Sequence, residues 1–373
     1  MSKQFDVIVS GHLCLDMIPD MDHVPPHALA TPGHLFETGA MILATGGAVS
    51  NTGQALHRLG LNVGLMSTIG DDFIGEAILK IIRARDPQLT DLITVRPGHS
   101  SSYTIVLAPQ RSDRTFLHHT GPNQNFGAQD IDFARLRDTR VFHLGYPPLL
   151  PRLVADEGRE LRDVFQKAQA AGAITAMDMT LPDPDGATGR ADWRAILAHT
   201  LPHVDIFIPS IEEIIFMLRR PDFDAWRGDV LSHLTSDYLS TLADELLSMG
   251  VAIAGFKLSE MGFYLKTAPA SRILPLNRHL PLDAEAWGSV TLWQPAFQVD
   301  VVGTIGAGDA AYAGFFAALL RSLPPAEALR RACAAGACNV EAADAVSGVR
   351  SWAETEARLQ AGWPVHSRRL PGV

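Results

Sequence analysis

A glycine-rich loop that ends in an acidic residue is the segment of this sequence best suited to chemistry. Residues 303–309 read GTIGAGD and continue into the small-residue, helix-forming stretch AAYAGFFAALL. Backbone N–H groups at the start of such a helix, together with the helix dipole, form a site for an anion. Asp309 falls in the first turn of the expected helix, directly beside that site.

A carboxylate beside an anion site is unfavourable if the loop only binds phosphate, because the two charges repel each other. It is useful if Asp309 accepts the proton of a hydroxyl group that attacks phosphorus while the N–H groups stabilise the transferring phosphoryl group. The alternative is an ordinary acidic residue at a helix N-terminus, and composition alone does not separate the two. The sequence contains no GxxxxGK[ST] loop, no GxGxxG after the first expected strand, no HExxH and no paired CxxC.

Strand-like and helix-like segments alternate along the chain and would position this loop. Expected strands lie at residues 5–11, 64–70, 140–146, 173–179, 204–210 and 251–259. Expected helices lie at residues 50–60, 73–85, 154–171, 211–220 and 239–249. This alternation predicts an α/β fold with a doubly wound, mostly parallel sheet and helices on both faces.

Two regions interrupt the alternation. Residues 12–43 and 99–120 contain short β-like pieces with no helix between them, so we expect a small, separate β-sheet that acts as a lid. Residues 221–238 and 267–298 have the character of insertions, and the second is expected to form an extra hairpin. Since no repeat or linker is evident, we expect a single domain over residues 1–373.

The composition limits the partners and the compartment. The chain has 31 basic and 41 acidic residues and a formal net charge of −10, which disfavours nucleic acid as a partner. No apolar run is long enough to span a bilayer, and the N-terminus lacks the features of a signal peptide. Three irregularly spaced cysteines argue against a disulfide framework. We therefore expect a soluble, cytoplasmic protein without nucleic-acid or membrane partners.

Two motifs in the expected order resemble the signatures of a known family. GGAVSN at residues 46–51 and GAGD at residues 306–309 resemble the two signatures of the ribokinase family of carbohydrate kinases, also called the PfkB family. GDDFIG at residues 70–75 matches another recurring segment, and the resemblance extends over residues 5–350. It implies a ribokinase-like fold with a β lid over the sugar site, and transfer of the γ-phosphoryl group of ATP with the help of Mg²⁺.

The resemblance also implies roles for individual residues. Asp309 matches the catalytic base, and the anion hole matches Gly306, Ala307 and Gly308. The sugar-binding positions match Asp16, Gly46, Gly47 and Asn51. The physical chemistry agrees, because a carboxylate can accept two hydroxyl hydrogen bonds and an amide both donates and accepts. From the sequence alone, Asp16 is better explained as a turn residue before Pro19, and Asn51 could equally be a helix-cap residue.

The chain departs from the family pattern at several positions. Ser210 replaces the asparagine of the family's Asn-x-x-Glu motif, while Glu213 keeps the acidic position associated with the metal and phosphates. Lys257 and Ser259 occupy the nucleotide-binding segment; the alternative for Lys257 is a solvated lysine at a strand end. Many members have aspartate where this chain has Gly303, and the arginine that often follows Asp178 in fructokinase-like members is missing.

Three functions remain open at this level. The first is a sugar kinase, and the second is a nucleoside kinase on the same fold, with Tyr103, Phe116 and Phe142 as candidates for a base-binding slot. The third is a non-catalytic sugar or nucleotide sensor, which would have no need of a base such as Asp309. An exposed lid face would also allow a homodimer. The sequence does not identify the acceptor or the hydroxyl group that is phosphorylated.

Overall fold

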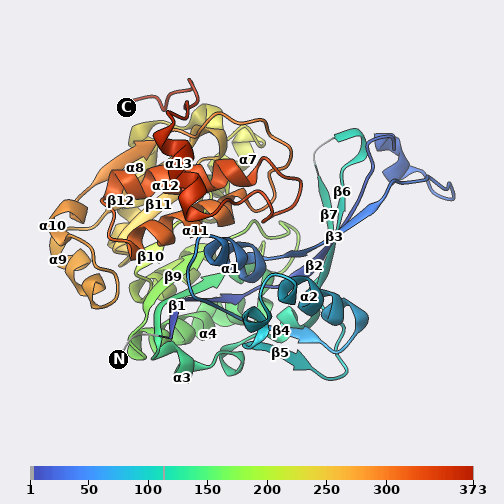
Figure 1. The fold of residues 1–373 in the computed structure, drawn as a ribbon, viewed down its shortest axis with the longest axis horizontal. Helices are drawn as coiled ribbons and strands as arrows, with labels where there is room; N and C mark the ends of the chain where they lie inside the picture. The colour runs from blue at the N-terminus through green and yellow to red at the C-terminus, as the bar shows by residue number, and fades with distance from the viewer. Residues whose placement is uncertain (1–3, 112–113, 373) are drawn as a thin grey trace.

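The computed structural model describes residues 4–111 and 114–372, and its main body is a large sheet covered by helices (Figure 1). Ser112 and Asp113 of the expected lid, and the chain ends at residues 1–3 and 373 of the expected single domain, lie outside the described residues. The strands of the main sheet are β1 (Phe5–Gly11), β4 (Val63–Gly70), β5 (Ile93–Arg96), β8 (Thr139–Gly145), β9 (Ile174–Asp178), β10 (Ile206–Phe207), β11 (Ile253–Lys257), β12 (Phe263–Thr267) and β13 (Thr291–Gln294). Their order across the sheet is β13-β12-β11-β10-β9-β8-β1-β4-β5.

This sheet confirms the predicted α/β class. Its strands pair in parallel except at one edge, where β12 is antiparallel to both β11 and β13. The helices are α1 (Ala48–Arg58), α2 (Phe73–Arg83), α3 (Phe133–Leu136), α4 (Pro151–Ala170), α5 (Trp193–Thr200), α6 (Ile211–Leu218), α7 (Arg220–Trp226), α8 (Ser236–Ser248), α9 (Ala270–Ile273), α10 (Ala284–Trp287), α11 (Ala307–Leu320), α12 (Pro325–Asn339) and α13 (Trp352–Gln360).

Helices cover both faces of the sheet, and each face has its own apolar core. Because successive strand residues point to opposite faces, Val7 and Val9 of β1 pack with residues of α1 and α11. Ile8, between them, packs instead with residues of α4 and α8. The near-continuous apolar runs of the central strands follow from this burial on both sides.

A second, four-stranded sheet projects from the body at the upper right of Figure 1. It consists of β2 (Cys14–Pro19), β3 (Met41–Gly46), β6 (Tyr103–Leu107) and β7 (Thr115–His119), in the order β3-β2-β6-β7. These strands come from the two regions expected to form a lid, although β3 extends three residues past the expected limit of 43. Asp72 ties the base of this sheet to the body, because its carboxylate accepts hydrogen bonds from the backbone N–H of Gly75 in α2 and of Ser101.

Two local predictions were wrong. Residues 267–298 do not form a hairpin, because α9 and α10 separate β12 from β13, which nevertheless pair with each other. The expected strand at 204–210 shrinks to β10, whose two residues are Ile206 and Phe207. Within the described residues, no helix is both long enough and apolar enough to cross a membrane.

The strand order places a topological switch point between β1 and β8. The chain proceeds from β1 to β4 and β5 on one side, and from β8 to β9, β10 and β11 on the other. Open α/β sheets bind ligands beyond the carboxyl ends of the strands at such a point. The residues that follow β1 and β8 are His12 and Tyr146, which directs attention to this edge of the sheet.

Candidate active site

The glycine-rich loop forms the start of α11. Gly306 caps this helix with φ 73°, a left-handed conformation that glycine adopts without steric cost. Asp309 lies in the first turn of the helix and is 2% exposed. The N–H of Ala307 makes only a long, 3.4 Å contact to the carbonyl of Thr304, and the next N–H groups have no acceptor within the helix. The predicted loop, helix start and carboxylate therefore lie together.

Three side chains donate hydrogen bonds to the carboxylate of Asp309. Thr52 Oγ1 donates to Oδ1 at 2.8 Å, whereas Asn51 Nδ2 and the Tyr146 hydroxyl donate to Oδ2 at 3.1 Å and 2.7 Å. Asn51 and Thr52 come from the first turns of α1, and Tyr146 follows β8. The sequence analysis missed Thr52 and Tyr146. The position of Tyr146 at the end of an expected strand was the only signal available for it.

Asn51 and Asp16 were predicted to contact the acceptor, and the structure places both near the Gly46–Gly47 turn. Within residues 4–111 and 114–372, Asn51 Oδ1 is buried without a hydrogen-bond partner, so this acceptor atom remains for a ligand. Asp16 is 9% exposed, and a Cβ at Gly46 would collide with its carboxylate. Gly47 has φ 86°, and a Cβ there would collide with His12. The two glycines therefore let Asp16 and His12 lie directly against the turn.

Burial makes the carboxyl group of Asp16 harder to ionise. It raises the pKa of the carboxyl to about 6, even though hydrogen bonds from Cys14 and Thr104 act in the opposite direction. The thiol of Cys14 lies 3.4 Å from Oδ1. A buried carboxylate with so few donors has capacity left for the hydroxyl groups of a ligand.

Lys257 is not a solvated lysine at a strand end. Its Nζ lies 2.6 Å from both carboxylate oxygens of Asp178, at the ends of β11 and β9, and its side chain is 9% exposed. Burial alone would lower the pKa of Lys257, but the carboxylates of Asp178, Glu213 and Asp309 outweigh it and raise that pKa. The side chain of Lys257 lies against the glycine-rich loop, since a Cβ atom at Gly308 would be only 3.3 Å from Lys257 Cδ.

Glu213 stabilises the N-terminus of its own helix, α6. Its Oε2 accepts the backbone N–H of Ser210 at 2.7 Å, which completes a capping box at the start of α6. Burial, together with the carboxylate of Asp178, raises the pKa of Glu213 to about 7, although Lys257 lowers it. The neighbouring Glu212, which the sequence analysis did not select, lines the adjacent cavity.

A cavity of about 530 Å³ borders the glycine-rich loop, and neither Asn51 nor Tyr146 lines it. It brings together the three nucleotide-binding candidates Lys257, Ser259 and Gly308. Much of the remaining lining is small or apolar, from Phe263, Phe297, Val299, Val301, Ala307, Ala311, Ala337 and Val340. An apolar cavity that ends at a helix N-terminus suits a flat base at one end and phosphates at the other.

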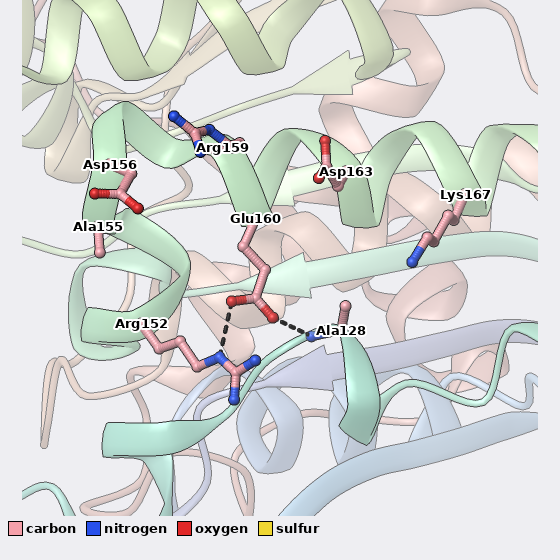
Figure 2. A pocket seen from close by; sticks show the side chains of 8 residues that line it. All are labelled: Ala128, Arg152, Ala155, Asp156, Arg159, Glu160, Asp163 and Lys167. Atoms are coloured by element: carbon pink, nitrogen blue, oxygen red, sulfur yellow. Dashed lines mark hydrogen bonds and ion pairs between the residues drawn. The ribbon is translucent and has the colours of Figure 1, made fainter.

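A second cavity lies away from these residues, at an interruption of α4 (Figure 2). Residues 155–158 of this helix lack helical dihedral angles. Charged side chains dominate the lining, and an ion pair joins Arg152 and Glu160 at 2.8 Å. Glu160 also accepts the N–H of Ala128. None of the candidate site residues contributes to this cavity.

Comparisons with known proteins agree with this geometry. A family model described as pfkB family carbohydrate kinase matches residues 5–352. The 2-dehydro-3-deoxygluconokinase of Bacillus subtilis is 23% identical over 322 residues, which are 84% of this chain and 86% of that protein. The structure of Arabidopsis thaliana ribokinase complexed with ribose and ATP aligns with a TM-score of 0.72 at 16% identity, over 96% of this chain and 99% of that one. A fructokinase from Xylella fastidiosa with bound ATP aligns with a TM-score of 0.71 at 19% identity, over 95% and 98%.

The chain belongs to the PfkB family of carbohydrate kinases. It is therefore an enzyme that transfers a phosphoryl group, built on the ribokinase fold. The solved structures share less than a quarter of their residues with this chain and support the fold alone.

Proposed function

We propose that this enzyme transfers the γ-phosphoryl group of ATP to a hydroxyl group of a sugar or a sugar-like molecule. The observation that carries this proposal is the position of the glycine-rich loop. Gly308 lines the cavity suited to a nucleotide, and the next residue, Asp309, accepts hydrogen bonds from Asn51 and Tyr146. A single helix start thus borders both the expected donor and the expected acceptor.

In this proposal, Asp309 is the general base. Its Oδ2 accepts the proton of the attacking hydroxyl as the bond to phosphorus forms. The N–H groups of Gly306, Ala307 and Gly308 stabilise the negative charge on the phosphoryl oxygens, and the dipole of α11 acts in the same sense. Lys257 contributes positive charge from the side of the cavity, held in place by Asp178.

Mg²⁺ is the expected metal partner of ATP. When bound, it would neutralise phosphate charge during transfer. Mg²⁺ usually keeps several waters and binds through one or two carboxylates plus phosphates. Glu213 fits such a site through its free oxygen or through water, because its Oε2 already accepts the N–H of Ser210. Lys257 and Ser259 would contact the nucleotide beside it.

The nucleoside alternative loses one of its three aromatic candidates. Phe142 is fully buried and packs on Phe165 in the core beneath α4, so it cannot line a base-binding slot. Phe116 is 55% exposed on β7, and the Tyr103 ring contacts His119. A neighbour named as a nucleoside kinase, from Methanocaldococcus jannaschii, shares the fold with a TM-score of 0.65 at 16% identity, so the fold alone does not exclude this acceptor.

The test is ATP turnover with purified enzyme, Mg²⁺ and a panel of neutral sugars, sugar acids and nucleosides, followed by identification of the phosphorylated product. We expect a sugar or sugar-like acceptor to give the highest kcat/KM. Preferred phosphorylation of a nucleoside would replace the proposal with the alternative. Binding of ATP and sugar without turnover would favour the sensor.

A further inference from the structure

His12 is a buried residue that the proposed reaction leaves without a role. It follows β1 directly, is 2% exposed, and neither of its ring nitrogens has a hydrogen-bond partner among the described residues. An imidazole buried without partners loses the hydrogen bonds that water would have supplied. Such a group is expected where a ligand completes the hydrogen bonding.

The fold places His12 in a chain of contacts that reaches the expected base. The centroid of its ring lies 6.3 Å from the ring centroid of Tyr146, across the switch point between β1 and β8. The hydroxyl of Tyr146 in turn donates a hydrogen bond to Asp309. On its other side, the ring of His12 lies 5.1 Å from that of His118, an exposed residue of β7. His12 therefore bridges the main sheet and the four-stranded sheet at the expected acceptor position.

The four-stranded sheet extends this chain to Asp16. Asp16 is opposite Thr104 in the β2–β6 register, and Thr104 is opposite His118 in the β6–β7 register. Residues paired in this way lie on one face of the sheet. Thr104 Oγ1 lies 3.0 Å from His118 Nδ1, so a hydroxyl and an imidazole interact beside the Asp16 carboxylate.

We propose that His12, together with Thr104 and His118, forms a binding subsite for uncharged hydroxyl groups of the acceptor, so that the enzyme selects neutral sugars over sugar acids. This inference rests on the proposed kinase function and adds to it the class of acceptor. The 2-dehydro-3-deoxygluconokinase relative is named for a carboxylate substrate. The inference therefore predicts an acceptor different from that of the relative.

The chemistry of the cluster favours hydroxyl groups over a carboxylate. Burial, with the neighbouring His118, lowers the pKa of His12, so its ring is uncharged near neutral pH. A neutral imidazole has one donor and one acceptor nitrogen, and a hydroxyl group satisfies either, whereas a carboxylate only accepts. In the part of the chain that the structure describes, the amide oxygen of Asn51 is likewise an acceptor without a partner, which a hydroxyl but not a carboxylate can satisfy.

The charges around the cluster act in the same direction. The carboxylates of Asp16 and Asp309 stand at its two ends. For His12, Asp16, Asn51 and Thr104, the hydrogen bonds and ring contacts within the described parts of the chain involve no lysine or arginine. A substrate carboxylate bound at this cluster would meet the like charges of Asp16 and Asp309.

The experiment compares two neutral sugars, ribose and fructose, with two sugar acids, gluconate and 2-dehydro-3-deoxygluconate. For each, kcat/KM is measured with ATP and Mg²⁺, and binding without ATP is measured by calorimetry. The variants are His12→Leu, which removes both ring nitrogens, and His12→Gln, which keeps a donor and an acceptor. His143→Leu is the matched control, because His143 is also buried, its nitrogens have no partner among the residues that the structure describes, and its ring packs on Tyr312 and Phe316.

We expect a neutral sugar to give the highest kcat/KM of the four. His12→Leu should raise the KM for that sugar about two- to tenfold with kcat little changed, and His12→Gln should recover part of the loss. His143→Leu should change the melting temperature but not the KM. A higher kcat/KM with a sugar acid, or an unchanged KM in His12→Leu, would overturn the subsite while the kinase function stands.

The binding measurements separate the two proposals. Calorimetric binding of a neutral sugar that is lost in His12→Leu, without turnover of any acceptor, would support the subsite and overturn the kinase function. Binding of the sugar acids alone, or of none of the four compounds, would overturn the subsite.

Discussion

The hydroxyl of Tyr146 donates a 2.7 Å hydrogen bond to Oδ2 of Asp309, the oxygen that the proposed mechanism assigns to the attacking hydroxyl group. Asn51 donates to the same oxygen. Tyr146 is held in place by its backbone, which has a left-handed φ of 63° and donates its N–H to the carbonyl of Asp178. In the proposed mechanism, the phenol therefore occupies the place at Asp309 that the acceptor hydroxyl requires.

Tyr146→Phe tests this relationship, because it removes one hydroxyl and keeps the ring. Without the phenol, the acceptor no longer competes for Oδ2, and water gains access to the base when no acceptor is bound. We expect the KM for the acceptor to fall about two- to tenfold and ATP hydrolysis without acceptor to rise, as measured by phosphate release. A large loss of kcat with unchanged KM would show instead that the phenol assists the chemical step.

Asp309→Asn tests the base itself. The substitution keeps the size of the side chain and the helix start but removes the proton acceptor, so kcat should fall at least about a hundredfold. ATP binding, measured by calorimetry, should change little. Asp283→Asn is the control, since Asp283 also lies at a helix N-terminus, that of α10, but on an insertion. Turnover of Asp309→Asn at the wild-type rate would leave Asp309 as an ordinary helix-terminal residue.

The sequence predicted the sheet and the glycine-rich loop well because both depend on local patterns. A window of about ten residues is enough to recognise an apolar strand such as β1 or β8. The same holds for a glycine-rich loop that precedes a helix of small residues. The resemblance to the family then associated Asp16, Asn51 and Asp309, which are far apart in the chain. The structure brings Asn51 into contact with Asp309 through the amide nitrogen, and within the described residues Oδ1 has no partner.

The remaining features depend on tertiary contacts that no local pattern encodes. Lys257 ends a strand and looks solvated in sequence, but Asp178, 79 residues away, pairs with it in the buried sheet. Thr52 and Tyr146 carry no motif and acquire a role only through the packing of α1 and β8 around Asp309. The hairpin expected at 267–298 does not form because part of this segment folds into the helices α9 and α10.

The ion pair between Lys257 and Asp178 makes a prediction about stability. Removing one member of a buried pair leaves an uncompensated charge and typically costs about 3 to 5 kcal/mol. Lys257→Met and Asp178→Asn should therefore each lower the free energy of unfolding by about that amount in denaturant titrations. The double variant should be destabilised by less than the sum of the two. Additive effects would mean that the two groups do not interact.

The outer face of the four-stranded sheet makes a prediction about assembly. The register aligns Leu43, Met17, Ile105 and Leu117 across this sheet, and Leu43 and Leu117 are 46% and 53% exposed. An apolar row of this kind favours pairing with a second copy of the chain. We expect a dimer by analytical ultracentrifugation, and Leu43→Glu with Leu117→Glu should convert it to a monomer.

Phe73→Glu is the control for this assembly, because Phe73 is 79% exposed at the start of α2, outside the four-stranded sheet. It should leave the dimer intact. A wild-type enzyme that remains monomeric at high concentration would contradict the prediction.

Replacing Asp16 by asparagine is expected to stabilise the fold but to weaken acceptor binding. The pKa of Asp16 is raised by burial from 3.8 to about 6 in the folded protein, so the folded state disfavours the ionised carboxylate. This group therefore stabilises the fold most below about pH 4, and that contribution is lost as the pH rises through 6. Asp16→Asn cannot ionise, so its free energy of unfolding should exceed that of the wild type above pH 6 by about 2 to 3 kcal/mol, and the difference should vanish near pH 4.

The same substitution should weaken acceptor binding, because it removes a charged acceptor of sugar hydroxyl bonds that typically contribute about 1.5 to 3 kcal/mol. The KM for the sugar should rise at least about tenfold at pH 7.5, while the Kd for ATP stays constant. The wild-type KM should also rise as the pH falls below 6 and Asp16 takes up a proton, whereas the KM of Asp16→Asn should lack this dependence on Asp16. Stability profiles from denaturant titrations at pH 4 to 8 and sugar kinetics over the range where the enzyme stays folded test both effects. A variant that is stabilised at pH 7.5 but binds the sugar as tightly as the wild type would show that Asp16 destabilises the fold without contributing to acceptor binding.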